Sequence, residues 1–418
     1  MMKKMILIFV LNVIIILPVT VFSEGLEING FVRNYSGILL EGDNDYSIVQ
    51  NTLDLSFKKS EGDIGFVSNI FVYQYPSKEN YFGIRELYMD YYSESVDLRI
   101  GKQQIIWGQA DGVFITDIVS PKNLTEFLLW DFNEIRMGVT AAKGKYYINS
   151  DNSLELVWIP MFTPTLMPEE GSIWHPKMSF PLEPSFDMTK SEVDKNLNNS
   201  ELFGRYSLNL SWIDLQVMGG YTFDDDPSIH VKRGFSIDSV TGTKYLSSMV
   251  VSPEYHRLNV GGLSFSADLT SFILRGEGAY YNNKYFQTAD PIASDGLIKK
   301  DYINYVVGID KTVGEWKLST QFIQKIILDY EDNLIGDEMD NLATILVSKS
   351  FMREKLRLEL FSYVGFNNED ALIRLKGYYY PSDAFGIEFG SNVFVGNEGT
   401  FGQFNGNNMV YAKIKYNF

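Results

Sequence analysis

The sequence contains few of the residues that form disulfides, interrupt β-strands or act as catalytic bases. Of its 418 residues, none is Cys, 13 are Pro and 3 are His. The absence of cysteine excludes a small secreted domain held together by disulfides. The formal net charge of −17 argues against nucleic-acid binding, because phosphate backbones are bound by basic surfaces. Beyond the N-terminus, no apolar run has the length of a membrane-spanning helix.

The N-terminus has the pattern of a secretory signal peptide. Two lysines precede an apolar run over residues 5–17, and a small residue, Ser23, follows it. This order is typical of a cleaved leader, whereas a transmembrane anchor would need a longer run. We therefore expect residues 1–23 to be removed by cleavage near Ser23, which leaves residues 24–418 as the mature chain.

Beyond the leader, apolar and polar residues alternate in segments of about ten residues, a period typical of β-strands. Eighteen such segments begin near residues 26, 47, 62, 82, 95, 133, 152, 201, 213, 255, 271, 301, 314, 341, 354, 370, 384 and 408. Their connections alternate between short turns such as 93–95 and long loops such as 160–200. This predicts an all-β fold: a transmembrane antiparallel up-and-down β-barrel of about 18 strands, or alternatively 16, with long extracellular loops. We expect residues 24–418 to form this one outer-membrane β-barrel domain. A soluble β-sandwich also alternates, but it does not explain the asymmetry of the connections.

Charged residues within these segments alternate with apolar ones, so the two kinds should lie on opposite faces of the barrel wall. An arginine or lysine that faces lipid at mid-depth costs about 2–4 kcal/mol, which directs charges to the lumen. The predicted lumen-facing charges are Arg99, Glu134, Arg136, Arg275, Glu277, Arg357, Glu359, Arg374, Lys376, Lys413 and Lys415. The predicted lipid-facing residues beside the first three are Val96, Leu98, Ile100, Ile135, Met137 and Val139. The charges could neutralise each other across neighbouring strands, or line a water-filled path for ions and anionic solutes.

The last strand alternates up to the final residue. In "VYAKIKYNF", one face carries Val410, Ala412, Ile414, Tyr416 and Phe418. A closed barrel has no free edge, so this strand must pair with the first one. A C-terminal strand ending in Phe also resembles the signal read by the bacterial barrel assembly machinery. That resemblance implies Tyr416 and Phe418 as the assembly signal, and outer-membrane lipid as the surroundings.

The connection over residues 103–132 is unusually apolar for a loop. Hydrophobic side chains occupy positions 113–115, 118–119, 124 and 127–130. Such a loop is poorly suited to water, so we expect residues 109–132 to fold inward, where a constriction would be lined or braced by Asp111, Asp117, Glu126 and Asp131. The stretch "SPKNLTEFLLWD" predicts a short helix with Asn123 as N-cap. The alternative is a loop that packs at the barrel mouth without a role in selectivity.

The sequence offers no catalytic motif. It contains neither a G-x-S-x-G elbow nor an H-E-x-x-H pair. Its acidic clusters do not match the spacing of a calcium loop. The histidines, His175, His230 and His256, fall in predicted loops or at a strand start. We therefore expect neither an enzyme nor a cofactor or metal site.

Three stretches carry a family resemblance: "LRIGKQQIIWGQADGVFITDIVSPKNLTEF", "RMGVTAAKG" and "LELVWIPMFTPTLMPEEGSIW". They resemble a largely uncharacterised family of porin-like bacterial outer-membrane β-barrels, often grouped with alginate or hydrophobic-compound porins. The resemblance covers residues 95–175. It implies a barrel and transport, but no particular substrate.

The expected function follows from barrel width and charge. A barrel of about eighteen strands is too wide for wall side chains alone to fill. We expect an outer-membrane porin-like channel for passive transport of small polar or anionic solutes. The apolar loops over 110–130 and 160–180 favour an alternative function, in which a plugged barrel transports hydrophobic compounds or lipids. A structural or adhesin barrel is a further alternative. A homo-oligomer is compatible with this class, although the sequence reveals no interface.

Overall fold

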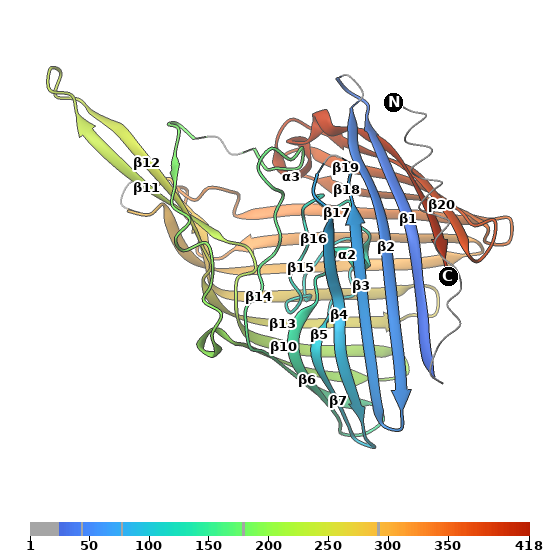
Figure 1. The fold of residues 1–418 in the computed structure, drawn as a ribbon. Coiled ribbons are helices and arrows are strands. Elements are labelled where there is room, and N and C mark those ends of the chain that lie inside the picture. The colour runs from blue at the N-terminus through green and yellow to red at the C-terminus, as the bar shows by residue number, and fades with distance from the viewer. Residues whose placement is uncertain (1–24, 43–44, 77, 178–179, 291–292) are drawn as a thin grey trace.

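The computed structural model describes residues 25–42, 45–76, 78–177, 180–290 and 293–418. These residues form a closed antiparallel β-barrel of eighteen strands (Figure 1). The strands are β1 (Leu26–Leu39), β2 (Tyr46–Glu61), β3 (Ile64–Gln74), β4 (Tyr81–Tyr92), β5 (Val96–Gln103), β6 (Val139–Tyr147), β7 (Asn152–Ile159), β9 (Glu201–Asn209), β10 (Ile213–Phe223), β13 (Arg257–Asp268), β14 (Ile273–Gln287), β15 (Leu297–Val313), β16 (Trp316–Ile327), β17 (Met339–Phe351), β18 (Leu356–Gly365), β19 (Asp370–Tyr379), β20 (Phe385–Val395) and β21 (Met409–Asn417). The predicted signal peptide, residues 1–23, lies outside the described residues.

The predicted all-β barrel with eighteen strands is confirmed. Each barrel strand pairs antiparallel with the next barrel strand along the chain, and β21 pairs with β1. All predicted segments except those of β6 and β15 begin within two residues of a strand. Period-two alternation was a strong signal here, because every strand has one face toward lipid and one toward the interior.

The seam of the barrel extends to the last residue. The β1–β21 ladder pairs residues 31–39 with residues 409–417. Beyond the ladder, Gly30 and Phe418 exchange two backbone hydrogen bonds, of 2.9 and 3.0 Å. Gly30 permits this contact, because a Cβ at that position would lie 3.0 Å from the Phe418 ring. Both strand ends therefore complete the wall, and no free edge is left at the seam.

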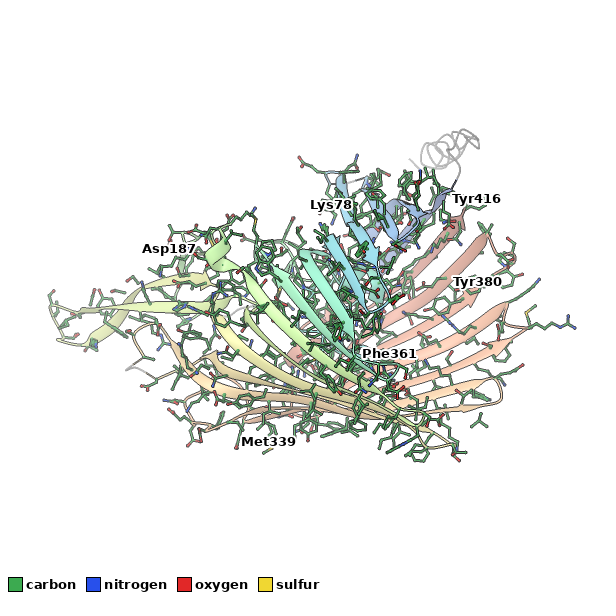
Figure 2. All side chains as sticks on the ribbon, turned by 90° about the horizontal axis from the view of Figure 1, so that it is seen from below. Lys78, Asp187, Met339, Phe361, Tyr380 and Tyr416 are labelled. Carbon is green, nitrogen blue, oxygen red and sulfur yellow. The ribbon has the colours of Figure 1, made fainter. Side chains whose placement is uncertain are left out.

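Side chains alternate between the two faces of the wall (Figure 2). On the outer face, Leu98, Ile100 and Leu358 are 42%, 63% and 43% exposed. On the inner face, Arg374 and Lys413 are 7% and 5% exposed. This is the arrangement of an apolar outer belt with charged groups directed to the inside of the barrel. Among the described residues, no helix is long and apolar enough to cross a membrane.

The start of β6 differs from the sequence prediction. The alternation predicts a strand from residue 133, but Phe132–Ile135 forms a short helix, α2, and β6 begins at Val139. Ile135 and Val139, predicted to face lipid, are each 2% exposed in clusters inside the barrel. That prediction is wrong, and Met137 lies outside the wall strands. The helical turn before the strand breaks the two-residue alternation. The pattern on its N-terminal side therefore does not show which residues of the strand face lipid.

The helix predicted over "SPKNLTEFLLWD" does not form. Asn123 accepts a hydrogen bond from the Thr125 amide at 3.1 Å, as an N-cap would. Residues 125–128 nevertheless make a turn, and Phe127 has a φ of 53°. Asn often bonds its local backbone in this way and thereby competes with a helix. The turn places Phe127 against Phe404, with ring centroids 4.9 Å apart, and this packing replaces the helix.

The long connections gather at the end of the barrel opposite to the short turns. One of them carries a hairpin of β11 (Ser228–Ile237) and β12 (Lys244–Glu254), which pairs with β8 (Ser185–Phe186). Figure 1 shows this hairpin extending away from the barrel. Figure 2 places Asp187, next to β8, at the opposite end from Tyr380 and Tyr416. The loops also hold three short helical turns: η1 (Leu197–Asn199), α3 (Gly399–Gly402) and η2 (Asn405–Asn407).

The buried core lies inside the barrel, between the wall and the loop over residues 104–138. Figure 1 shows α2 within the barrel. One apolar cluster joins Leu129 of this loop to Tyr363 of β18 and Phe394 of β20. Another joins Trp107 of the loop to Phe203 of β9. The prediction of an inward-folded apolar loop is confirmed, and we call residues 104–138 the inserted loop.

Candidate functional site

The inserted loop divides the barrel interior into two cavities. The outer cavity, of about 810 Å³, lies among the long-loop ends of the strands. The inner cavity, of about 500 Å³, lies among the short-turn ends. Gly112 of the inserted loop and Tyr363 of β18 line both cavities. The partition between the two spaces is therefore at Gly112.

A single carboxylate of β14 holds both arms of the loop tip. Glu277 is 5% exposed and accepts hydrogen bonds from the amides of Gln109 and Ala110. It accepts two more from Thr116, from the amide at 3.1 Å and from the hydroxyl at 2.7 Å. Four donors satisfy a buried charge that would otherwise be costly. Glu277 therefore fixes the loop and is not a free charge in the lumen.

Arg275, on the same face of β14, holds the tip from the other side. Its guanidinium donates to the Gln109 carbonyl at 2.8 Å and pairs with Asp111. It also pairs with Asp310 of β15 at 2.9 Å. Gln321 of β16 exchanges two hydrogen bonds with the Asp111 backbone, of 2.7 and 3.1 Å. Three adjacent strands therefore fix the tip, and Arg275 compensates the charge of Asp111.

Gly112 brings the loop backbone directly onto the wall. Its carbonyl accepts a hydrogen bond from the Tyr363 hydroxyl at 2.7 Å. Its φ is +79°, and a Cβ would lie 2.4 Å from the ring of Phe361. Only glycine combines a positive φ with so close an approach. The partition therefore depends on the lack of a side chain at this position.

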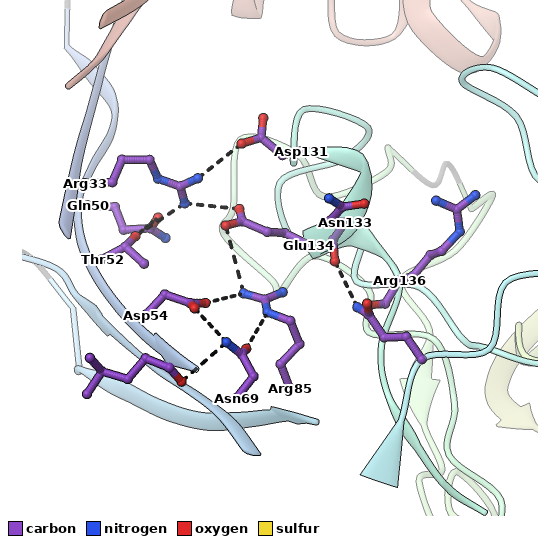
Figure 3. A network of polar contacts seen from close by, with 12 residues as sticks. Arg33, Gln50, Thr52, Asp54, Asn69, Arg85, Asp131, Asn133, Glu134 and Arg136 are labelled. Atoms are coloured by element: carbon purple, nitrogen blue, oxygen red, sulfur yellow. Dashed lines mark hydrogen bonds and ion pairs between the residues drawn. The ribbon is translucent and has the colours of Figure 1, made fainter. Parts of the chain in front are cut away.

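The returning arm of the inserted loop is held to β1–β4 by a polar network (Figure 3). Arg33 of β1 contacts Asp131 at 3.2 Å and Glu134 of α2 at 3.1 Å. Arg85 of β4 lies 3.9 Å from the same Glu134 and 3.5 Å from Asp54 of β2. Two wall arginines thus share one carboxylate of α2. Because these groups are mostly buried, removing any one of them would leave its partners uncompensated.

Asp117 and Arg136 form a buried pair that closes the loop on itself. Asp117 is 3% exposed and accepts hydrogen bonds from the amides of Trp107 and Gly108, each at 2.8 Å. It also accepts one from Arg136 Nε at 2.8 Å. The pair braces the inserted loop internally, although Asp117 also lies on the lining of the outer cavity.

The inner cavity has a basic lining. Among the described residues, six basic side chains line it, namely Arg33, Lys317, Arg374, Lys376, Lys413 and Lys415, with four acidic ones, namely Asp111, Asp131, Glu359 and Glu388. Lys413 contacts Asp131 at 2.7 Å and Glu388 at 3.5 Å. Burial opposes ionisation of Asp131, but Lys413 and Arg33 outweigh it and hold the pKa of this carboxyl below its usual range. Arg374 donates to the loop carbonyl of Leu128 at 2.9 Å.

The outer cavity has the opposite charge balance. Its described lining includes seven acidic side chains, namely Asp117, Asp224, Asp225, Asp226, Asp337, Asp340 and Asp370, and three lysines, namely Lys122, Lys284 and Lys325. Lys284 pairs with Asp224, and Lys122 lies 3.7 Å from Asp225. Burial raises the pKa of the Asp225 carboxyl to about 8, and Lys122 offsets this only in part.

The predicted constriction residues fall into three groups. At the partition, the structure brings together Asp111, Arg275 and Glu277. Around the inner cavity it places Asp131, Glu359, Arg374, Lys376, Lys413 and Lys415. Within the inserted loop and its anchors it places Asp117, Glu134 and Arg136.

Three other predicted constriction residues belong to none of these groups. Arg99 pairs with Asp90 at 2.7 Å, and the Arg357 guanidinium lies 4.2 Å from the ring centroid of Tyr378. Glu126 accepts a hydrogen bond from Trp174 Nε1 at 3.0 Å. Burial raises the pKa of the Glu126 carboxyl against the opposing charge of Lys78.

Sequence reasoning missed Gly112, Arg33, Gln321 and Tyr363. The Asp-Gly pair at the loop tip was a signal for a positive φ, since glycine marks such turns. Arg33 follows the same alternation as the other inward charges. For Gln321 and Tyr363 there was no signal, because their partners in the loop are 210 and 251 positions away in the chain.

The comparisons with known proteins agree with this architecture. Residues 65–418 match the family described as "Protein of unknown function (DUF1302)", and the chain therefore belongs to this family. Among solved structures, the chain is similar to Pseudomonas aeruginosa OccK8 (OprE), with a TM-score of 0.56 and 9% identity, over 95% of this chain and 99% of that one. Acinetobacter baumannii OccAB4 gives a TM-score of 0.55 and 10% identity, over 94% of this chain and 98% of that one.

A third similar structure, Pseudomonas aeruginosa OccD3 (OpdP), gives a TM-score of 0.55 and 10% identity, over 96% of this chain and 92% of that one. These neighbours are bacterial outer-membrane porins, and the chain has their fold. A search of curated proteins finds no match to the sequence. At such low identity the similarity concerns the fold alone, so the solute has to be argued from this chain's own residues.

Proposed function

We propose that this protein is a porin-like channel of the bacterial outer membrane, through which small polar or anionic solutes diffuse. The observation that carries the proposal is the pair of charged cavities in line along one wide barrel, separated only by the inserted loop. A charged, wetted lumen suits polar solutes, because it replaces part of their hydration. No chemical step is required of the protein in this role.

The basic inner cavity supports the preference for anions. Its six basic side chains come from strands whose positions are fixed by ladder hydrogen bonds. Arg guanidinium and Lys ammonium groups bind carboxylate or phosphate groups by charge-assisted hydrogen bonds. An anionic solute that passes the partition would therefore meet donors held at fixed positions.

A plugged barrel for hydrophobic compounds is the second candidate. It is favoured by apolar side chains of the inserted loop on the outer cavity, including Val113, Phe114, Ile115 and Leu124. An apolar lining suits apolar ligands, and the Gly112–Tyr363 contact would then act as a closed partition rather than as one side of an open pore.

Three further assignments belong to this proposal. Residues 1–23 would be a leader cleaved near Ser23, which N-terminal sequencing of the mature protein would test. Tyr416 and Phe418, at the seam, would be read by the barrel assembly machinery. Their outward rings are 47% and 37% exposed. A homo-oligomer would be tested by the mass of the detergent complex.

The experiment that tests the channel is single-channel conductance of the refolded mature protein in a planar bilayer, with the reversal potential under a salt gradient. We expect stable conductance steps and a preference for anions. Absence of steps in the folded barrel, together with steps after deletion of residues 109–132, would favour the plugged barrel. Absence of conductance steps from both the full mature protein and the deletion variant would contradict both transport functions.

A further inference from the structure

Two of the chain's three histidines meet at the base of the β11–β12 hairpin. His230 of β11 and His256, two residues beyond β12, have their Nε2 atoms 2.8 Å apart. Oε2 of Glu254, the last residue of β12, lies 3.7 Å from His230 Nε2. One ligand atom from each of the three residues lies within 4.8 Å of the others. Two imidazoles and a carboxylate therefore converge on one point.

A fourth residue orients one of these imidazoles. Oδ2 of Asp295, in the loop between β14 and β15, lies 3.2 Å from His230 Nδ1. A carboxylate at Nδ1 keeps the proton on that nitrogen, so Nε2 of His230 presents its lone pair to His256 and Glu254. This carboxylate–imidazole arrangement is the usual support of a metal-binding histidine.

The site is at a structural junction rather than on an open surface. His230 is 8% exposed, and the side chain of Glu254 is 16% exposed. His256 packs against Tyr285 of β14, with ring centroids 4.1 Å apart. The amide of Val231, next to His230, donates to the Asp295 carbonyl at 2.7 Å. The hairpin, Asp295 of the loop that follows β14, and the barrel rim therefore meet at this cluster.

We propose that His230, Glu254 and His256 bind a divalent d-block cation, with Zn²⁺ as the best fit, and that Asp295 is a positioning residue. Two nitrogens and one oxygen suit Zn²⁺ in four-coordinate geometry, with water in the remaining position. Ca²⁺ and Mg²⁺ prefer oxygen ligands. Zn–N bonds of about 2.0–2.1 Å place two tetrahedral nitrogens about 3.3 Å apart, so the imidazoles separate slightly on binding. The bound cation would tie the hairpin to the rim above the outer cavity.

Two basic residues lie beside the cluster: Lys299, whose charge acts on His256 and whose ammonium lies 4.9 Å from the ring centroid of Tyr285, and Lys190, which is directed away from the binding point. Lys190 contacts Oε1 of Glu254 at 3.0 Å, whereas Oε2 faces His230. Its side chain is 65% exposed, so it can turn into solvent when a cation neutralises Glu254. The two carboxylate oxygens are thereby available for separate roles.

The test is isothermal titration of the full mature chain with ZnCl2, using protein purified without a histidine tag. Excess CaCl2 in the buffer occupies the weak all-oxygen sites of this acidic protein. We expect one tightly bound Zn²⁺, and with CoCl2 the intense visible bands of four-coordinate Co²⁺. The double substitution His230→Gln and His256→Gln should abolish both signals, and Asp295→Asn should weaken binding about 10–100-fold.

The matched control is His175→Gln, which changes the remaining histidine and should leave binding unchanged. Nδ1 of His175 lies 3.2 Å from the Pro168 carbonyl, in the 160–200 loop, which contributes none of the proposed ligands. Heat-modifiable mobility in electrophoresis shows whether each variant barrel is folded. Equal Zn²⁺ binding by the folded double variant, or a Co²⁺ spectrum of six-coordinate type in the wild type, would overturn the proposal. So would equal loss of binding in the His175 control.

Discussion

The outer and inner cavities share one barrel, but their charges come from different parts of the chain. All six basic groups of the inner cavity are on wall strands. Of the seven acidic groups of the outer cavity, five are in loops, and Asp340 and Asp370 are in strands. Strand positions are fixed by ladder hydrogen bonds, whereas loops are more mobile. The inner cavity can therefore hold its charges at defined positions, and the outer cavity offers mainly a diffuse field.

This difference assigns separate tasks to the two cavities. A diffuse acidic field at the mouth changes the local concentration of ions, and it weakens with rising ionic strength. Fixed basic groups beyond the partition can form direct hydrogen bonds with a solute. We therefore expect selectivity to be set mainly in the inner cavity, with the partition at Gly112 limiting the current. Substitutions at the partition should therefore change the current most, those in the inner cavity less, and those in the outer cavity least.

The largest effect is expected from Glu277→Gln, which removes the partition and thereby joins the two cavities. The carboxylate satisfies four loop donors, and hydrogen bonds to charged groups contribute about 1.5–3 kcal/mol each. A neutral amide accepts fewer and weaker bonds, so the loop tip should leave the wall. Single-channel conductance should rise several-fold, and the channel should become noisier.

The matched control for that prediction is Glu359→Gln, the same change on β18 in the inner cavity. Glu359 lines the cavity wall and not the partition. Its substitution should leave conductance close to that of the wild type. Equal conductance changes in the two variants would mean that the partition does not limit the current.

An intermediate effect is expected from the double substitution Lys376→Glu and Lys415→Glu in the inner cavity. A unit charge about 8 Å from the solute path contributes about 0.5 kcal/mol in water. Two reversals change the local charge by four units, or about 2 kcal/mol for a monovalent ion, which corresponds to about a thirtyfold change in the permeability of that ion before screening by salt. The reversal potential under a salt gradient should move toward cation preference.

Lys325→Glu and Lys284→Glu make the same charge change in the outer cavity and complete the comparison. Both lysines are on wall strands, as in the inner pair, but we expect a smaller shift there, because the outer cavity is larger, about 810 Å³ against about 500 Å³, so its charges lie farther from the solute on average. A shift as large as that of the inner pair would place selectivity at the mouth and contradict the assignment.

The strands were predictable because alternation has a physical cause at every position of the wall. The seam at Phe418 and the inward charges on β14, β19 and β21 follow from the same rule. The start of β6 was not predictable, because α2 is stabilised by the Arg33–Glu134 contact, which joins residues 101 positions apart. Local rules also favoured a helix near Asn123, but the aromatic packing of Phe127 inside the barrel overrode that preference.

The candidate site was predictable only in part, for the same reason. The alternation along the strand indicated that Arg275 and Glu277 face inward, but not that both bind the inserted loop. The role of each charge depends on which loop atom it meets, and those partners are more than 160 positions away. These partners decide whether an inward charge is buried or faces a cavity. Glu277 and Asp117 are buried against the inserted loop, whereas Lys376 and Lys415 line the inner cavity.

The smallest effect is expected from the pH dependence of Asp225 in the outer cavity. Burial raises the pKa of its carboxyl from 3.8 to about 8, so at pH 7 the group is mostly neutral. Between pH 7 and pH 9 it should ionise and add one negative charge, which increases cation permeability roughly twofold at about 0.5 kcal/mol. The reversal potential should shift accordingly in the wild type, and Asp225→Asn should remove the shift.

The direction in which folding stability changes with pH provides an independent check on the raised pKa of Asp225. The folded protein holds this proton more tightly than the unfolded chain, so its contribution to stability falls as pH rises from about 4 to about 8. Asp225→Asn should therefore flatten that part of the stability profile, measured by thermal unfolding in detergent. If the variant were instead less stable than the wild type throughout neutral pH, Asp225 would be ionised there and paired with Lys122. The outer cavity would then already carry its full negative charge, and its contrast with the inner cavity would be independent of pH in this range.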